Sequence, residues 1–353
     1  MLTGWQEPLR LDRRGVWTVS SDFQGFWWRP RNAQVHEDVE QLLGLKVTDV
    51  LVWAEPFVDR VDEWSELLHR VQASGIRFHT WITANHHYAQ SFVQRLRNHS
   101  DWVAVDYQGF SSDVRPLAGV QTWACPANEE RWLKEWEIWM PLVQGTNGLH
   151  LDYIRYPDGF RFGDKPEIDR VEVLEQSFCY CAQCCQRFQA DYGINPRTIP
   201  VEDGNSDFAH WQHWRQERIV DQVAWYREQL RKEKDPSMRL SAAVFPTPAI
   251  ARKNVQQNWP KFAQFLDFVC PMIYAKQFWG QPVSWTEDAV RQGKAELATG
   301  TKLLAGIGPY ESYRPDELAE AIWSGRAGGS DGEMLFLFPM PPSYLAALKT
   351  VWV

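Results

Sequence analysis

Short apolar stretches alternate with amphipathic helical stretches along most of this chain. Eight stretches are short, rich in β-branched and aromatic residues, and bounded by Gly, Pro or polar residues, which is typical of strands. They span residues 15–20, 47–56, 76–84, 148–157, 239–246, 267–274, 302–310 and 332–339. Apolar residues recur at helical spacing over 62–75, 128–144, 210–234, 282–300 and 314–328. Mostly apolar strands that alternate with helices indicate a parallel sheet buried on both faces.

Eight such units predict an α/β fold, a (β/α)8 TIM barrel that forms a single domain over residues 1–353. The alternative is a doubly wound open sheet, but no glycine-rich phosphate-binding turn follows the first strand. Segment 158–209 interrupts the alternation and holds Cys residues at 179, 181, 184 and 185. We therefore expect a Cys-rich insertion after strand four.

Charge and hydropathy exclude several classes of partner. The formal net charge is −8, and Lys and Arg form no long run, so we expect neither a nucleic-acid nor a membrane partner. No stretch has the apolar length of a spanning helix, and residues 1–15 lack the apolar core of a signal peptide, which favours a cytoplasmic location. The 20 Trp residues suit stacking on sugar rings, although packing between helices and strands accounts for most of them.

A carboxylate lies near the end of the fourth predicted strand, in "GLHLDYIRYP". Parallel barrels carry their active sites at the carboxyl ends of the strands. His150 and Asp152 share one face of the strand, so an inward face puts Asp152 in the mouth and His150 one layer below. The competing interpretation is an ion pair with Arg155 that closes the strand. We predict Asp152 as a catalytic carboxylate.

Glycoside hydrolysis usually needs a second carboxyl group, about 5–5.5 Å away for retention or about 6.5–9.5 Å for inversion. Acids near the ends of other predicted strands are Glu55, Glu311, Asp22 and Asp106. Glu55 closes strand two and Glu311 follows strand seven, so these two rank first. Asp267 and Glu333 lie at strand starts and are expected to be structural.

Aromatic and polar side chains near strand ends form the predicted substrate-binding set: Trp53, His79, Trp81, Arg155, Tyr274 and Tyr310. Together they would make the aromatic, hydrogen-bonding rim that sugars need. Each of His79 and His150 also fits a histidine satisfied inside the barrel core.

The chain has a cluster of cysteines with metal-ligand spacing. Cys179, Cys181 and Cys184 form a C-x-C-x-x-C run, and zinc takes four ligands in a tetrahedron. Adjacent cysteines rarely both reach one metal, so Cys125 in "WACPAN" is a better fourth ligand than Cys185. Reduced or disulfide-bonded thiols are the alternative. A closed four-cysteine site leaves no open position, which indicates a structural metal.

Three stretches, "RRGVWTV", "GLHLDYIRYP" and "DFVCPMIY", resemble in order and spacing the barrels called glycosyl-hydrolase-like family 10. The resemblance runs from about Arg13 to Pro339. It implies a (β/α)8 barrel that cleaves or binds glycans, with Asp152 as the leading catalytic carboxylate. A double-Asp form of the motif occurs in that family, and Tyr153 stands here at the position of the second Asp.

The cysteines carry a second resemblance. "CPAN" followed by "CYCAQC" is similar to the zinc-binding cysteines of glycoside hydrolase family 42. This implies a structural zinc held by Cys125, Cys179, Cys181 and Cys184.

The leading hypothesis is a glycoside hydrolase acting on a poly- or oligosaccharide. The role of Asp152 depends on its pKa, which burial would raise toward a role as acid and which Arg155 would lower. Arg155 favours an anionic role as nucleophile or electrostatic stabiliser, with Glu55 or Glu311 as proton donor. A glycan-binding pseudoenzyme is the alternative, because the second Asp is missing from the motif. A third hypothesis is a protein in which the cysteines or their metal are functional.

Overall fold

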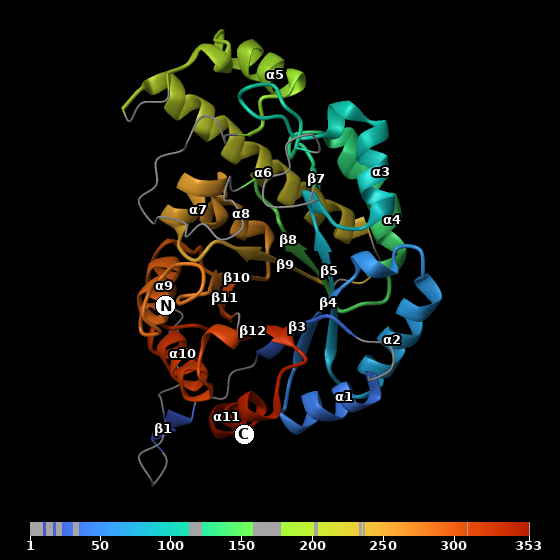
Figure 1. Ribbon diagram of the computed structural model, residues 1–353, viewed down its shortest axis with the longest axis vertical. Helices are drawn as coiled ribbons and strands as arrows, with labels where there is room; N and C mark the ends of the chain where they lie inside the picture. Colours follow the sequence, from blue (N-terminus) through green and yellow to red (C-terminus); the bar gives the residue numbers. More distant parts are fainter. Residues whose placement is uncertain are drawn as a thin grey trace, which may run out of the picture.

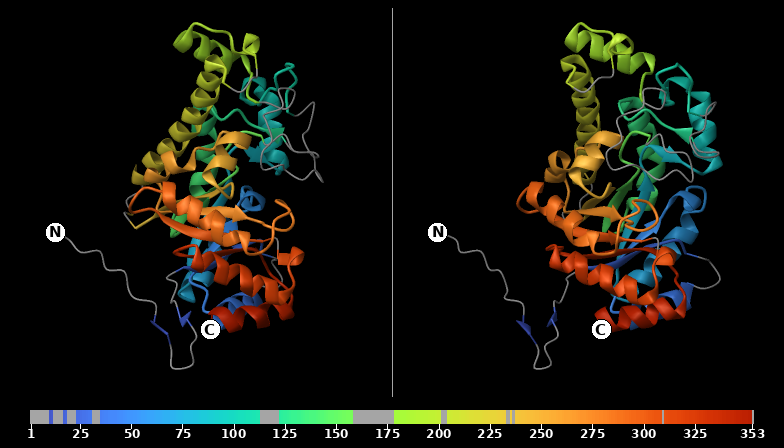
Figure 2. Two further views of the ribbon diagram at one scale, coloured as in Figure 1. Left: turned by 90° about the vertical axis from the view of Figure 1, so that its left-hand side faces the viewer. Right: turned by 60° about the vertical axis from the view of Figure 1, so that its left-hand side comes forward.

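Eight parallel strands close into a barrel wrapped by helices (Figure 1, Figure 2). The computed structural model describes residues 10–11, 17–18, 23–30, 35–112, 122–157, 178–200, 204–232, 235, 237–308 and 310–352. In chain order the barrel strands are β3 (Gln24–Trp28), β4 (Asp49–Trp53), β5 (Arg77–Thr83), β8 (Gly148–Asp152), β9 (Arg239–Val244), β10 (Phe268–Ile273), β11 (Lys302–Ile307) and β12 (Gly332–Phe338). The predicted (β/α)8 fold is confirmed.

The helices follow the strands they cover. They are α1 (Val35–Gly44), α2 (Val61–Ala73), α3 (Gln90–Asn98), α4 (Glu129–Val143), α5 (Ala182–Tyr192), α6 (Ser206–Lys232), α7 (Pro248–Val255), α8 (Trp259–Phe262), α9 (Trp285–Glu296), α10 (Pro315–Ala327) and α11 (Pro342–Trp352). The five predicted helical stretches correspond to α2, α4, α6, α9 and α10. Among the described helices, none is both long enough and apolar enough to cross a bilayer.

The position predicted for the first barrel strand is wrong. Within residues 15–20, β2 (Trp17–Thr18) pairs antiparallel with β1 (Arg10–Leu11), outside the barrel. The barrel uses β3, which pairs with β4 and β12. Both stretches contain Trp, and β3 has a partner on each edge and is buried along its length, a tertiary property that local pattern does not encode. Asp22 lies outside the described residues.

Alternation along the strands divides the apolar residues into two cores. Inward-facing side chains fill the barrel; its buried apolar members are Phe23, Trp27, Leu51, Trp81, Ala243, Phe268, Cys270, Leu304 and Met334. Outward-facing residues such as Val50 and Val52 join the larger core beneath the helices. Cys270 is therefore a barrel-core residue, as expected.

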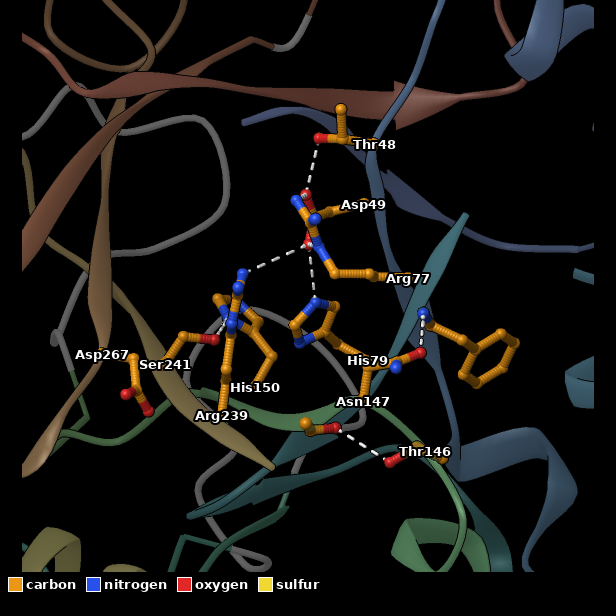
Figure 3. A network of polar contacts seen from close by, with 12 residues as sticks. Thr48, Asp49, Arg77, His79, Thr146, Asn147, His150, Arg239, Ser241 and Asp267 are labelled. Carbon is orange, nitrogen blue, oxygen red and sulfur yellow. Dashed lines mark hydrogen bonds and ion pairs between the residues drawn. The ribbon is translucent and has the colours of Figure 1, made fainter. Parts of the chain in front are cut away.

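A buried charge network occupies the barrel near the strand starts (Figure 3). The Asp49 carboxylate accepts hydrogen bonds from Arg77 at 2.8 and 2.6 Å and from the Thr48 hydroxyl at 2.6 Å, and it lies 2.9 Å from Nε2 of His79. Burial alone would raise the pKa of Asp49. The hydrogen bonds from His79, Arg77 and Thr48 outweigh burial and hold that pKa far below its usual 3.8.

His150 lies above this network and supports the strand that carries Asp152. Its Nε2 accepts from Nε1 of Trp27 at 3.1 Å, and its Nδ1 lies 2.9 Å from the Ser241 hydroxyl. An indole N–H only donates, so Nε2 is the unprotonated nitrogen and Nδ1 carries the hydrogen. Burial and the nearby His79 lower the pKa of His150 well below 6.5, which keeps the ring neutral.

The predicted insertion 158–209 is described at residues 178–200 and 204–209. These form α5, the short η5 (Pro196–Thr198) and the start of α6, and Figure 1 shows α5 at the top of the molecule beyond the barrel. Its cysteines follow β8, the eighth strand of the chain and the fourth in order among the barrel strands. Cys125 instead follows β7 (Thr122–Trp123), which pairs with β6 (His86–His87).

Replacing Asp49 with Ala should lower the free energy of unfolding by about 3 kcal/mol, because it removes a buried carboxylate that accepts hydrogen bonds from Arg77, His79 and Thr48. Urea denaturation at pH 7 measures this. Since the pKa of Asp49 is lowered on folding, its contribution is complete above the unfolded value and is lost as the pH falls below about 4. The exposed Asp316→Ala is the control, with a change within about 0.5 kcal/mol. Equal effects of the two substitutions would contradict the role of this network.

Candidate functional site

Asp152 ends β8 at the mouth of the barrel, with its carboxyl group largely buried. Nε1 of Trp81 donates to Oδ2 at 3.0 Å, and the amide of Tyr153 donates to Oδ1 at 2.7 Å. Burial raises the pKa of Asp152 above 3.8, against the lowering effects of the Tyr153 amide, Arg155, Trp81 and Arg29. The expectation that Arg155 would give a net lowering is therefore wrong, because desolvation of the carboxylate is the larger effect.

The residue after Asp152 has a strained backbone. Tyr153 has φ +52°, in the left-handed region that non-glycine residues seldom occupy, at a cost of about 1–3 kcal/mol. Its hydroxyl lies 2.8 Å from that of Tyr88, and its ring packs against His86 at 4.5 Å and Trp123 at 5.5 Å. These contacts hold the conformation that directs the Tyr153 amide at Asp152.

An arginine that sequence reasoning missed completes this end of the barrel. The guanidinium of Arg29 lies 4.6 Å from the ring centre of Trp53, 5.6 Å from that of Trp81 and 6.0 Å from that of Phe336. Arg29 directly follows β3, two residues after the inward-facing Trp27. The signal for it was the alternation along "GFWWR", which was not usable while the first strand was placed at 15–20.

The structure brings together three of the six predicted substrate-binding side chains beside Asp152. Trp53 and Trp81 pack at 6.3 Å between ring centres. Tyr274 follows β10, packs on Phe336 at 5.6 Å, and has its pKa raised by burial and by the charge of Asp152. We refer to Arg29, Trp53, Trp81, Asp152, Tyr274 and Phe336 as the mouth cluster.

Two of the predicted substrate-binding residues lie elsewhere. His79 is fully buried two residues below Trp81 and contacts Asp49, so it belongs to the barrel interior and not to the mouth. The alternative interpretation of His79 as a histidine satisfied inside the barrel core therefore describes its position. Tyr310 packs on Tyr344 of α11 at 5.0 Å and lines a cavity beside α1, apart from the mouth cluster.

Arg155 is buried on the wall next to the mouth cluster. Its guanidinium lies over the rings of Trp123, Tyr153 and Phe245, at 5.0, 4.9 and 4.9 Å from their centres. Trp123 and Tyr153 also contact each other, so Arg155 joins the strained turn after β8 to the β6–β7 hairpin. Arg155 is therefore placed to stabilise the packing of the turn after β8 against this hairpin.

Of the two predicted partner acids, Glu55 is engaged by hydrogen bonds and Glu311 is exposed. Glu55 is buried at the start of η2 (Glu55–Phe57) and accepts from the Thr83 hydroxyl at 3.0 Å and from the amides of Tyr88 and Ala89 at 2.6 and 2.7 Å. Glu311 is exposed in η7 (Tyr310–Ser312).

Asp106 is also engaged within its own loop. Its Oδ1 accepts from the Phe110 amide at 2.8 Å, and its backbone forms a bridge with Phe178. A carboxylate with such local donors is typical of a loop-stabilising role.

Four buried cysteine sulfurs form a second candidate site. Those of Cys125, Cys179, Cys181 and Cys184 all lie within 4.8 Å of one another. Cys125 lies 3.7 Å from Cys181 and 3.5 Å from Cys184. A tetrahedron with metal–sulfur bonds of about 2.3 Å has sulfur–sulfur edges of about 3.8 Å, so the donor set fits a four-coordinate metal ion.

Local backbone contacts also suit bound thiolates. The Val105 amide donates to the Cys179 sulfur at 3.4 Å, and the Cys184 amide donates to Cys181, which caps α5, at 3.5 Å. Burial raises the pKa of Cys179, so a divalent cation would be needed to keep all four groups ionised. Cys185 points elsewhere and donates to the carbonyl of Tyr180.

Comparisons with known proteins support the fold. No protein family model matches the sequence, and none of the curated proteins does. Similar solved structures include an α-galactosidase from Lactobacillus brevis (10% identity, TM-score 0.51) and an α-amylase from Lactobacillus plantarum (10% identity, TM-score 0.51). A third is the spore cortex-lytic enzyme SleL from Bacillus cereus (9% identity, TM-score 0.50).

The matches cover 94%, 89% and 94% of this chain, and 40%, 71% and 75% of the three solved chains, respectively. This chain thus spans less than half of the galactosidase. At such identities the similarity establishes a shared barrel and leaves the chemistry to be argued from the site.

We predict about one metal ion per chain in protein purified without added metal, measured by elemental analysis. A chelator should lower the melting temperature, because the free energy of metal binding is also folding free energy. Cys125→Ser should lower metal content and stability together.

Cys185→Ser is the matched control, since Cys185 is adjacent in sequence and lies outside the four-sulfur set. It should leave metal content unchanged. Metal-free protein that melts at the same temperature with and without chelator would refute the metal site.

Proposed function

We propose that this barrel binds a poly- or oligosaccharide at the mouth cluster and cleaves a glycosidic bond there. The observation that carries the proposal is a buried carboxyl group at a strand end, Asp152, with a raised pKa and the indoles of Trp53 and Trp81 beside it. The partly exposed indole of Trp53 suits the apolar face of a sugar ring, and a carboxyl group whose pKa is raised by burial suits a general acid. The resemblance to glycosyl-hydrolase-like family 10 agrees with this assignment.

In this proposal Asp152 donates its proton to the glycosidic oxygen as the bond to the anomeric carbon breaks. Water then adds to that carbon and gives up a proton to a base. The hydrogen bond from Trp81 fixes the Oδ2 side of the carboxyl group, and the Tyr153 amide fixes Oδ1. This role replaces the anionic one expected from Arg155, because the pKa of Asp152 is raised.

The second carboxyl group remains a choice between Glu55 and Glu311. Glu55 would have to exchange its hydrogen bonds to Thr83, Tyr88 and Ala89 for a water molecule, and Glu311 would have to turn inward from an exposed position. This requirement favours a second candidate function, a glycan-binding protein that does not cleave. Both candidates use the same mouth cluster.

For the cysteine cluster we propose a structural zinc ion held by Cys125, Cys179, Cys181 and Cys184. Four thiolates in a closed set suit zinc and leave no position for a substrate. When bound, the ion supplies a cross-link between the segment that precedes α4 and the segment that precedes α5. The resemblance to the cysteines of glycoside hydrolase family 42 points to the same ion.

Asp152→Asn should abolish glycan cleavage while leaving sugar binding within a few-fold of wild type, because the amide keeps the shape but cannot supply the proton. Reducing-end assays and calorimetry on both proteins measure this, with circular dichroism as the fold check. Cleavage by the variant at the wild-type rate would exclude Asp152. Binding without cleavage by wild type would establish the non-cleaving alternative.

Glu55→Gln and Glu311→Gln distinguish the candidate second acids. Only the variant that lacks the base should have a lower kcat, and its KM should be unchanged. If neither substitution lowers the rate, both assignments are wrong.

The rate should fall as the pH rises above the raised pKa of Asp152, since the acid must be protonated to act. Its charged or ionisable neighbours are Arg29, Arg155, Tyr88, Tyr153 and Tyr274, and the tyrosines stay neutral because their pKa values are raised. A kcat profile between pH 4 and 8 tests this. A rate that rises with pH through this range would contradict the proton-donor role.

A further inference from the structure

Arg29 carries a charge that no described carboxylate neutralises. Its side chain is exposed, and within the described part of the chain its guanidinium contacts aromatic rings and makes no ion pair. Most other described arginines on the surface, such as Arg60, Arg70 and Arg252, pair with a glutamate. A cation left without a partner at the mouth of a barrel is available to a ligand.

The three rings hold this guanidinium in a defined place. Cation–π contacts with Trp53, Trp81 and Phe336 restrict it without using its N–H donors. The Trp81 indole lies between the two functional groups, since it contacts Arg29 and donates to Asp152. A sugar stacked on the partly exposed Trp53 would therefore have an acid and a fixed fork of donors close to it.

Arg29 and Asp152 interact electrostatically but form no ion pair in the described structure. The guanidinium lowers the pKa of Asp152 less than Arg155 does, and the carboxyl group remains shifted toward its neutral form by burial. Because burial disfavours the charged form of Asp152, its carboxyl group opposes an anionic ligand less than an exposed carboxylate would.

We propose that the mouth cluster selects an acidic glycan and that Arg29 binds the anionic group of the sugar, a uronic-acid carboxylate. This rests on the proposed function and names its substrate class. The planar guanidinium matches a carboxylate with two parallel hydrogen bonds, which an ammonium does not. Because the whole chain carries a net charge of −8, an acidic sugar needs a local cation of this kind to bind.

A row of contacting aromatic rings continues from the mouth cluster to an exposed ring. Phe278 is 45% exposed and packs on Tyr274, which in turn packs on Phe336 beneath Arg29. These rings extend from Arg29 toward the surface over the segment after β10. In this proposal Arg29 binds one sugar unit, and the neighbouring sugar units stack on the aromatic rings.

The test uses matched oligosaccharides that differ only in charge. Oligogalacturonides and glucuronate-substituted xylo-oligosaccharides are compared with their carboxyl-reduced forms, in which CH₂OH replaces the carboxylate. Calorimetry should show that wild type binds the acidic forms at least about tenfold more tightly. Arg29→Gln should remove this preference, because it should weaken binding of the acidic forms far more than binding of the reduced forms, while Arg29→Lys should retain part of it.

Arg231→Gln is the control for net charge, because Arg231 is an exposed arginine at the end of α6. It should keep the wild-type preference. Binding of sulfated oligosaccharides whose carboxyl groups have been reduced is measured in the same way. Preference for sulfate over carboxylate would overturn the uronic-acid assignment.

The outcomes separate this inference from the proposed function. Equal binding of acidic and reduced forms, with cleavage of either, would overturn the role of Arg29 and leave the glycoside-cleaving proposal standing. Failure of wild type to bind or cleave any of these glycans would overturn both. Loss of preference in Arg231→Gln as well would show a general charge effect and overturn the assignment to Arg29.

Discussion

The two-residue alternation of strands in a closed barrel decides what each part of this molecule can do. Every inward-facing side chain is held at a fixed height, because its neighbours on both flanking strands are hydrogen-bonded in register. Asp49 and His79 meet near the strand starts, Trp27 and His150 meet above them, and Trp81 meets Asp152 at the strand ends. Chemistry at the mouth thus depends on packing and hydrogen bonds completed in the layers below.

Two buried aspartates in one barrel show how donors set protonation. Asp49 receives hydrogen bonds from a guanidinium and a hydroxyl and faces His79, so its pKa is lowered and it stays ionised. Asp152 receives one indole N–H and one amide, while both nearby arginines contact aromatic rings, so burial prevails and its pKa is raised. The first arrangement stabilises the ionised carboxylate, whereas the second shifts the carboxyl group toward its protonated form where the barrel opens.

The features that could be predicted from the sequence are those set by residues close together in the chain. The strand around Asp152, its inward face and the spacing of Cys179, Cys181 and Cys184 were all readable, because periodicity and ligand spacing are properties of neighbouring residues. Arg29 was not found, since its position depends on which of two aromatic stretches closes the barrel. The engagement of Glu55 by the Tyr88 and Ala89 amides was equally invisible, because those donors come from the next strand's loop.

Short segments connect the cysteine cluster to the mouth cluster. A metal ion bound by the cysteines would therefore affect the geometry of the mouth cluster. Trp123 lies two residues before Cys125, and Arg155 packs on Trp123 and on Tyr153. Burial and the nearby Cys184, Cys125 and Cys179 raise the pKa of Tyr156. A metal that fixes Cys125 relative to Cys179 therefore also fixes the wall that holds the strained backbone after Asp152. In that proposal the ion would act by position alone, because it would hold the turn that directs the Tyr153 amide at the carboxyl group of Asp152.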